Sequence, residues 1–459
     1  MSNHLSLNSA METPSLSQAL RFWFKLGCIS FGGPAGQIAI MHRELVEERR
    51  WISERRFLHA LNYCMLLPGP EAQQLATYLG WLMHRTWGGV AAGVLFVLPS
   101  LFLLIGLSWV VVAFGDVPWI AAVLWGIKPA VAALVIQAVH RIGSKTLHSP
   151  RHAPLLWLIA VLSFIAVAIL QVPFPAVVFA AALSGWLGQR WVPQQFSASA
   201  AHGAGNTPSH AGHAPAWIDD NTPTPNHALF SKHRLARVLG VGLTLWLLPM
   251  AGLVGAWGWD GTLTQMGWFF TKAALLTFGG AYAVLPYVYQ GAVEHFGWLT
   301  GPQMMDGLAL GETTPGPLIM VVTYVGFLGG WSKAVLGADS LFMGAALAAV
   351  VVTWFTFLPS FIFILAGGPF VESTRGKLQL TAPLTAITAA VVGVIASLAV
   401  FFLMHLAYLP AQGGNPAALD WAALFIAVLA GFALMRLKWG VVVVIACCAV
   451  LGVAYRTLF

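Results

Sequence analysis

The sequence predicts an all-α polytopic membrane protein built from two inverted-topology repeats with broken, re-entrant helices. Of its 459 residues, 58% are hydrophobic and 8% are charged, with a mean hydropathy of +0.77. Soluble globular domains are less apolar and carry about 25% charged residues. Several apolar runs approach or exceed the ~20 residues that cross a bilayer, namely 90–114, 119–139, 155–170, 235–257, 341–366, 380–408 and 441–453.

A duplicated motif indicates the two repeats. Phe31-Gly32-Gly33 recurs as Phe278-Gly279-Gly280, and Pro68-Gly69-Pro70 recurs as Pro315-Gly316-Pro317. The offset is 247 residues in both cases (278 − 31 and 315 − 68), and it also relates Lys25 to Lys272 and Trp51 to Trp298. Glycine and proline break helices, and broken backbone inside a bilayer is tolerated only where protein buries it or it lines a cavity. The duplicated breaks are therefore expected at the centre of a transporter fold.

Each repeat is expected to begin with two broken apolar segments. In the first repeat these are residues 16–41, interrupted at Gly32-Gly33-Pro34, and residues 57–81, interrupted at Pro68-Gly69-Pro70. Neither side of the second interruption is long enough to span a membrane, so two helix halves in a re-entrant hairpin fit better than a straight helix. The charged stretch 42–56 fits an amphipathic turn at the membrane surface.

Later landmarks extend the duplication through both halves. Leu98-Pro99-Ser100 pairs with Leu358-Pro359-Ser360 at an offset of 260 (358 − 98), and Pro129 pairs with Pro383 at 254 (383 − 129). The sequence thus divides into a tail at 1–17, a first repeat at 18–189, a linker at 190–234, an extra span at 235–257 and a second repeat at 258–459. The linker is polar and rich in Pro and Gly, so we expect it to be disordered. Its scattered histidines lack a recurring metal-ligand spacing, which favours a flexible linker over a metal site.

The distribution of Lys and Arg predicts that the two halves are inverted, because positive residues mark cytoplasmic loops. Residues 43–56 hold five Arg, whereas the matching loop 290–303 holds neither Lys nor Arg. A later pair of loops reverses this pattern, with no positive residue in 115–118 but Arg375 and Lys377 in 367–379. The extra span at 235–257 adds one membrane crossing, so the second repeat enters the membrane from the opposite side. The N-terminus and the linker are therefore expected in the cytoplasm and the C-terminus in the periplasm.

Each break places a helix start inside the membrane, with unpaired backbone N–H groups and the positive end of the helix dipole. Converging starts of this kind form a site for an anion. A plain kink is the alternative for any single break, but duplication at equal spacing favours a functional centre. The candidate substrate-binding residues at the breaks are Gly32, Gly33, Pro34, Pro68, Gly69, Pro70, Gln73, Gly279, Gly280, Thr314, Pro315, Gly316 and Pro317.

Three lysines in apolar surroundings are further candidates for binding the substrate. Lys272 follows Gly261 by 11 residues (272 − 261), which is about 16 Å along a helix, and a charge at such depth costs ~2.5–3.5 kcal/mol. Lys25 is its match, although its place near the start of a segment also allows the amine to reach the surface. Lys128 lies near mid-segment, and its match at an offset of 254 is Ala382.

Two carboxylates flank the proline breaks: Glu71 follows the first and Glu312 precedes the second. Both are candidates for proton coupling, because a buried carboxyl group holds its proton more tightly. For Glu71, stabilising the positive end of the following helix is an equal alternative. The sequence contains no phosphate-binding loop, nucleophile elbow or His-Glu-x-x-His pair, so we expect no enzyme, no metal and no cofactor.

The motifs together resemble the chromate transporter family in its long-chain, two-domain form. The resemblance covers both halves and is carried by Phe31-Gly32-Gly33-Pro34, Arg50-Trp51, residues 67–74, Tyr78-Leu79-Gly80, residues 277–282, Gly297-Trp298-Leu299 and residues 314–317. It implies chromate efflux across the bacterial inner membrane by an antiporter driven by the proton-motive force, giving chromate resistance. The second copy departs from the first at Ala281, in place of Pro34, and at Leu318, in place of Glu71, so unequal halves are expected.

The expected partners are the chromate anion and the lipid bilayer, and a homodimer is an open alternative to a monomer. Nucleic acid is not expected, because the net charge of +7 is spread over loops. A membrane potential that is negative inside favours the exit of a dianion by ~4.6 kcal/mol per 100 mV. This free energy sustains roughly a thousandfold outward concentration gradient. Two alternatives stay open: a carrier for sulfate or another tetrahedral oxyanion, and an uncoupled anion channel.

Overall fold

The computed structural model describes residues 14–31, 33–147, 149–192, 195, 216–278, 280–373, 381–408 and 419–458. Within these ranges the chain is helical apart from turns, loops and two isolated β-bridges. Before the linker lie α1 Leu16–Ile29, α2 Gly33–His42, η1 Arg43–Glu48, α3 Glu54–Leu66, α4 Glu71–Phe114, α5 Pro118–Thr146, α6 Pro154–Ala168 and α7 Phe174–Trp191.

The remaining helices begin with η3, which lies inside the linker. They are η3 Asn226–Ala228, α9 Lys232–Trp257, α10 Thr262–Leu276, α11 Ala281–Tyr289, η4 Gln290–His295, α12 Gly301–Thr313, η5 Leu318–Met320, α13 Val321–Ser332, η6 Ala338–Ser340, α14 Leu341–Ser373, α15 Thr381–Ala407, α16 Trp421–Met435 and α17 Val441–Leu458. Among the described residues, six helices are long and apolar enough to cross a membrane: α4, α5, α9, α14, α15 and α17.

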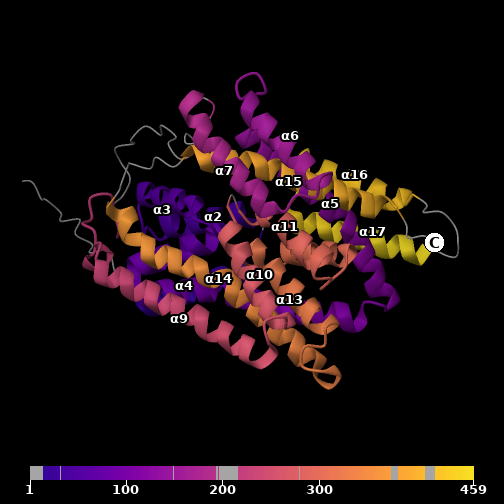
Figure 1. The fold of residues 1–459 in the computed structure, drawn as a ribbon, viewed down its shortest axis with the longest axis horizontal. Coiled ribbons are helices and arrows are strands. Elements are labelled where there is room, and N and C mark those ends of the chain that lie inside the picture. The colour runs from indigo at the N-terminus through magenta and orange to yellow at the C-terminus, as the bar shows by residue number, and fades with distance from the viewer. Residues whose placement is uncertain are drawn as a thin grey trace, which may run out of the picture.

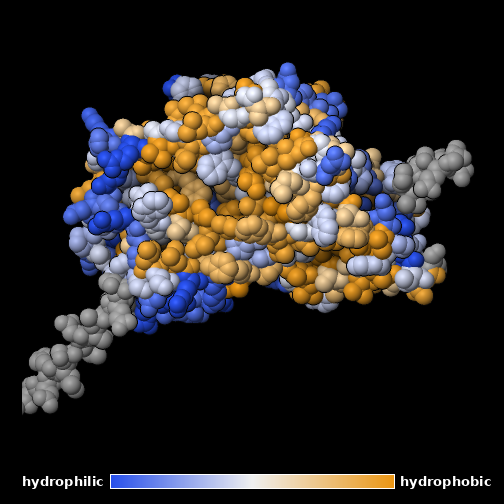
Figure 2. Space-filling view, turned by 90° about the horizontal axis from the view of Figure 1, so that it is seen from below, coloured by the Kyte–Doolittle hydropathy of each residue, from blue (hydrophilic) through white to orange (hydrophobic). Residues whose placement is uncertain are grey.

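The surface of the molecule matches a bilayer. Figure 2 shows a broad apolar band that separates polar regions at the two ends of the long axis. Large apolar side chains are exposed on several helices; Leu248 of α9 and Phe425 of α16, for example, are 68% and 64% exposed. Burying such surface in lipid stabilises it, because apolar area is removed from water. The prediction of an all-helical, multi-pass membrane protein is confirmed.

The helices break at all four places that the sequence predicts. α1 stops before α2, α3 before α4, α10 before α11, and α12 before η5 and α13. Each break carries a glycine with a positive φ angle: +69° at Gly33, +128° at Gly69, +94° at Gly280 and +107° at Gly316. Glycine adopts these angles without a steric penalty, whereas other residues are strained there. The local conformation of the breaks thus follows directly from their glycines.

The long helix α4 is two antiparallel arms and not one straight span. Its backbone leaves the helical conformation at 84–85, and the second arm folds back on the first. The arms approach so closely that a Cβ on Gly89 would lie 2.8 Å from the carbonyl oxygen of Thr77. α13 and α14 form a similar close pair, in which a Cβ on Gly326 would lie 2.9 Å from the carbonyl oxygen of Ala348. Glycines set the packing distance in both hairpins.

The helix bounds recur with the offsets of the sequence motifs. α12 begins 247 residues after α3 (301 − 54), and η4 begins 247 after η1 (290 − 43). The next helix after each hairpin matches at the larger offset. Adding 260 to the bounds of α5 gives 378–406 (118 + 260 to 146 + 260), close to the bounds of α15. The pairing of Pro129 with Pro383 is therefore wrong, because Pro129 lies inside α5 and Pro383 in the first turn of α15. On the offset of 260, Lys128 matches Thr388 and not Ala382.

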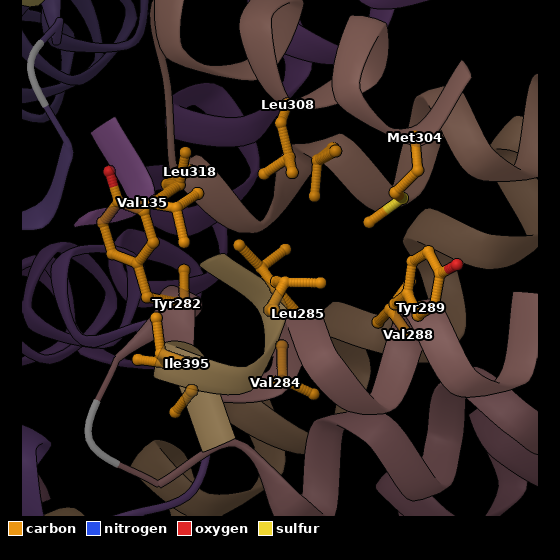
Figure 3. Packing of buried hydrophobic residues seen from close by; sticks show 14 of the residues in the cluster. Val135, Tyr282, Val284, Leu285, Val288, Tyr289, Met304, Leu308, Leu318 and Ile395 are labelled. Carbon is orange, nitrogen blue, oxygen red and sulfur yellow. The ribbon is translucent and has the colours of Figure 1, made fainter. Parts of the chain in front are cut away.

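The two halves of the chain interlock. α5 of the first half packs against α16 and α17 of the second, and α15 of the second half packs against α6 and α7 of the first. Figure 1 shows these helices interleaved, while α9 runs along the outside of α14. One cluster of buried apolar side chains joins both halves and includes Val135, Leu285 and Ile395 (Figure 3). The two halves therefore share one buried core.

Part of the linker is docked on the first half. Ile218 forms a parallel β-bridge with Ile52, and the amide of Trp217 donates to the carbonyl of Arg50 at 3.0 Å. The expectation of a disordered linker is therefore wrong for 216–231, because its two large apolar residues find a surface to pack on. The linker residues 193–194 and 196–215 lie outside the described part of the chain.

Candidate functional site

The broken turns of the two halves bind each other. The amide of Gly69 donates to the carbonyl of Thr277 at 2.8 Å, and the amide of Gly316 donates to the carbonyl of Ser30 at 2.9 Å. Ser30 matches Thr277, and Gly69 matches Gly316, at the offset of 247 (277 − 30 and 316 − 69). Each Pro-Gly-Pro turn therefore joins the residue that precedes the Gly-Gly break of the opposite half. We call this meeting point, formed by 30–31, 33, 68–71, 277–278, 280 and 314–317, the junction.

Close packing at the junction requires glycine at both Pro-Gly-Pro turns. A Cβ on Gly69 would lie 2.2 Å from the Ser360 hydroxyl oxygen, and a Cβ on Gly316 would lie 2.7 Å from the Ser100 Cβ. The two serines close the Leu-Pro-Ser motifs that the sequence repeats at an offset of 260. Ser100, in the second arm of α4, and Ser360, in α14, therefore flank the junction.

Three buried glutamines extend the polar surface of the junction. The Gln37 side-chain amide donates to the carbonyl of Gly316, and the Gln74 side-chain amide donates to the carbonyl of Pro68 at 2.7 Å. The neighbouring Gln73 donates to the Thr77 hydroxyl at 2.9 Å. All three glutamine residues are 0% exposed. The sequence analysis named Gln73 but not Gln37.

Several polar atoms of the junction are buried without a hydrogen-bond partner among the described residues. They are the hydroxyl groups of Ser30, Ser100 and Ser360 and the side-chain carbonyl oxygens of Gln37, Gln73 and Gln74. Each unpaired buried polar group costs about 1–3 kcal/mol, and native proteins keep few of them. Their concentration at one place is typical of a site that a polar ligand or water completes. The hydroxyl groups are donors suited to an oxyanion.

A charged cluster adjoins the junction at the start of α11. The Arg141 guanidinium of α5 lies over the ring of Tyr282 at 5.7 Å, and the Tyr282 hydroxyl donates to the Glu312 carboxylate of α12. Glu71 is also close, since a Cβ on Gly280 would lie 3.7 Å from its carboxylate oxygen. Both candidate carboxylates, Glu71 and Glu312, therefore lie near the start of α11. Figure 3 shows the Tyr282 ring beside Val135 of α5 and Leu318.

The three candidate lysines make contacts of other kinds. Lys25 forms an ion pair with Glu44 at 2.9 Å, and its side chain is 53% exposed. Lys272 lies 5.7 Å from the ring of Trp268, one helical turn earlier in α10. Lys128 forms an ion pair with Asp306 of α12 at 3.6 Å. The exposure of Lys25 agrees with the alternative that its amine reaches the surface of the protein.

The remaining candidates at the breaks are placed as follows. Pro68, Pro70, Pro315 and Pro317 flank the glycines of the two junction turns, and Gly33 and Pro34 open α2. The Thr314 hydroxyl is buried and donates to the carbonyl of Gly311 at 3.3 Å. Gly32 and Gly279 lie outside the described residues.

Sequence reasoning missed several residues that the structure places at or near the site. The matched hydroxyl residues Ser30 and Thr277 were detectable, because they share the offset of 247. Arg141 is a half-buried residue of α5 and belongs to none of the duplicated motifs. Neither Arg141 nor Asp306 has a charged match in the other half, so the duplication gave no signal for them.

The fold and the junction define a multi-pass membrane protein whose two halves meet at broken helices. The family model described as chromate transporter matches residues 17–186 and again 264–453. The chain belongs to the chromate transporter family, which is a family of transporters and not of enzymes.

Curated relatives agree with this family assignment. A chromate transport protein of Pseudomonas aeruginosa is 34% identical over 385 residues, covering 83% of this chain and 79% of that protein. A chromate transport protein of Cupriavidus metallidurans is 29% identical, covering 83% and 81%. An uncharacterized transporter of Methanocaldococcus jannaschii is 23% identical over 96% of this chain and 94% of its own length. No solved structure matches the chain.

Proposed function

We propose that this protein is a secondary carrier that exports chromate across the inner membrane and thereby gives chromate resistance. The observation that carries the proposal is the junction, where Gly69 and Gly316 each bond to the opposite half amid buried, unpaired hydroxyl groups. A site of this kind, reached from broken helices near mid-membrane, is the usual arrangement in secondary transporters. Names of the relatives supply the substrate, chromate.

The proposed architecture is a pair of inverted-topology repeats, over 18–189 and 258–459, with α9 as the extra crossing between them. The equal offsets of the helix bounds support the duplication, and so do the two segments matched by one family model. The distribution of Lys and Arg supports the inversion. The N-terminus and the linker then lie in the cytoplasm and the C-terminus in the periplasm. Arg375 and Lys377, which contribute to the argument, lie outside the described residues.

The substrate is proposed to bind at the junction turns, with Gly33 and Gly280 exposing backbone amides to it, while the amides of Gly69 and Gly316 hold the two halves together. The unpaired serine hydroxyl groups supply neutral donors, which suits a tetrahedral oxyanion. Glu71 and Glu312 are the proposed proton-coupling groups, because each lies near the start of α11. Export follows the membrane potential, since a dianion leaves a negative interior.

Transport of labelled chromate into everted membrane vesicles tests this function. We expect saturable uptake that depends on an imposed membrane potential or proton gradient and falls when an uncoupler is added. Complete competition by sulfate at equal concentration would instead favour a general oxyanion carrier. Flux that neither saturates nor runs uphill would favour an anion channel. No chromate flux above that of vesicles without the protein would reject the proposal.

A further inference from the structure

The charged cluster at the start of α11 is built from four different helices. Arg141 comes from α5, Tyr282 from α11, Glu312 from α12 and Glu71 from α4. Arg141 lies over the Tyr282 ring, the Tyr282 hydroxyl donates to Glu312, and the Glu71 carboxylate lies beside Gly280. Four segments that are far apart in sequence thus bring one guanidinium and two acids to the start of α11, beside the junction.

The cluster exists once, although the backbone around it is duplicated. The positions that match Glu71 and Glu312 at an offset of 247 hold Leu318 and Met65, and the match of Tyr282 is Ala35. The match of Arg141 at 260 is Phe401. The broken helices therefore do not need these polar side chains in order to form, since the other half forms the same breaks with apolar residues. A role in function explains the cluster better than a role in folding.

The three lysines that are candidates for binding the substrate are engaged elsewhere. Lys25 is paired with Glu44 and Lys128 with Asp306, while Lys272 lies against Trp268. Among the described residues of the apolar helices, one cation reaches the edge of the junction in this way. The Arg141 guanidinium lies over the ring of Tyr282, two residues after the junction residue Gly280. It is therefore the positive charge best placed to meet an anion at the junction.

We propose that Arg141 binds the transported oxyanion directly. The inference rests on the proposed transport function, and it adds the one charged contact that the neutral donors of the junction lack. A guanidinium presents a planar fork of N–H groups that matches two oxygens of an oxyanion. Without substrate, the guanidinium lies over the Tyr282 ring, with Glu71 and Glu312 near the same helix start. When the oxyanion arrives, it binds the guanidinium.

Flux measurements on Arg141 variants test the inference. We expect Arg141→Gln to lower the initial rate of chromate uptake at low substrate by about 10- to 100-fold, the loss expected for a hydrogen bond between charged groups. Arg141→Lys keeps the charge but not the fork, so its KM should rise several-fold more than its maximal rate falls. Arg151→Gln, in the loop after α5, is the matched control and should keep its rate within about twofold.

Double variants separate substrate binding from charge balance. If Arg141 only neutralises its neighbours, then removing a carboxylate as well, in Arg141→Gln/Glu312→Gln or Arg141→Gln/Glu71→Gln, should restore chromate binding to the purified protein, which needs no proton coupling. We expect both double variants to bind chromate as weakly as Arg141→Gln while reaching the membrane in normal amounts. Restored binding in either one, or a wild-type KM in Arg141→Lys, would overturn the inference. Because the wild-type protein is measured in the same vesicles, failure of the proposed function would be seen there independently. If Arg141→Gln does not reach the membrane, the KM of Arg141→Lys tests the inference instead.

Discussion

The amide of Gly69 and the carbonyl of Thr277 form a hydrogen bond of 2.8 Å that joins the first half of the chain to the second. Gly316 and Ser30 form the same bond with the halves exchanged. Both bonds link backbone atoms of broken turns, and their residues are buried. Any movement of one half against the other must therefore bend or break this pair of bonds, which connects the site mechanically to both halves.

Gly69→Ala is expected to abolish most transport. The φ angle of +128° strains any other residue, and the new Cβ would lie 2.2 Å from the Ser360 hydroxyl oxygen. Backbone strain of this kind costs about 1–3 kcal/mol. Initial chromate flux and the thermal unfolding midpoint in detergent should both fall. Gly106→Ala is the control, because its Cβ meets no atom within 4 Å. Wild-type flux in Gly69→Ala would show that the junction tolerates a shift.

Asp306→Asn is expected to destabilise the protein through Lys128. Asp306 is 4% exposed, and its carboxylate lies 3.6 Å from the Lys128 ammonium. Removing one member of a buried ion pair leaves the other charge unpaired and costs about 3–5 kcal/mol. The unfolding midpoint should drop clearly in Asp306→Asn and recover in the double variant Asp306→Leu/Lys128→Met. A double variant no more stable than the single one would argue against this pairing.

Acid is expected to weaken the surface segment η1 through Glu44. The hydrogen bond from Lys25, helped by one from Arg49, holds the pKa of Glu44 below its usual value of 4.5. Because the folded state then binds protons less readily, this stabilisation is present above pH 4.5 and is lost as the pH falls through the lowered pKa. Unfolding midpoints measured from neutral pH to below pH 4.5 should fall less in Glu44→Gln than in the wild type. Glu48→Gln, an exposed neighbour, should behave like the wild type.

Reporter fusions test the inverted topology. A fusion within 43–56 should report the cytoplasm, and a fusion within 290–303 should report the periplasm, because only the first loop carries arginines. The two loops hold η1 and η4, which occupy matching places in their halves. The same side for both loops would overturn the inversion.

The breaks were predictable because their cause is local. Gly69 and Gly316 stand between prolines, and this pattern alone stops a helix and allows a positive φ angle. The docking of part of the linker was not predicted. The residues around Trp217 and Ile218 are polar, so the sequence did not indicate that these two apolar side chains pack on the first half. The pairing of Lys128 with Ala382 failed for a similar reason, since an offset read from one proline pair ignored where the helices begin.

The sequence by itself determined that this chain is helical, lies in a membrane and breaks four of its helices in matched places. Hydrophobic length and the stereochemistry of glycine and proline act within a few residues, so they are visible in the chain alone. The tertiary structure decided which break meets which, and that Arg141 lies beside Tyr282 and Glu312 while Lys25 pairs with Glu44. Those neighbours come from helices far apart in sequence, and they meet only because the two halves pack into each other.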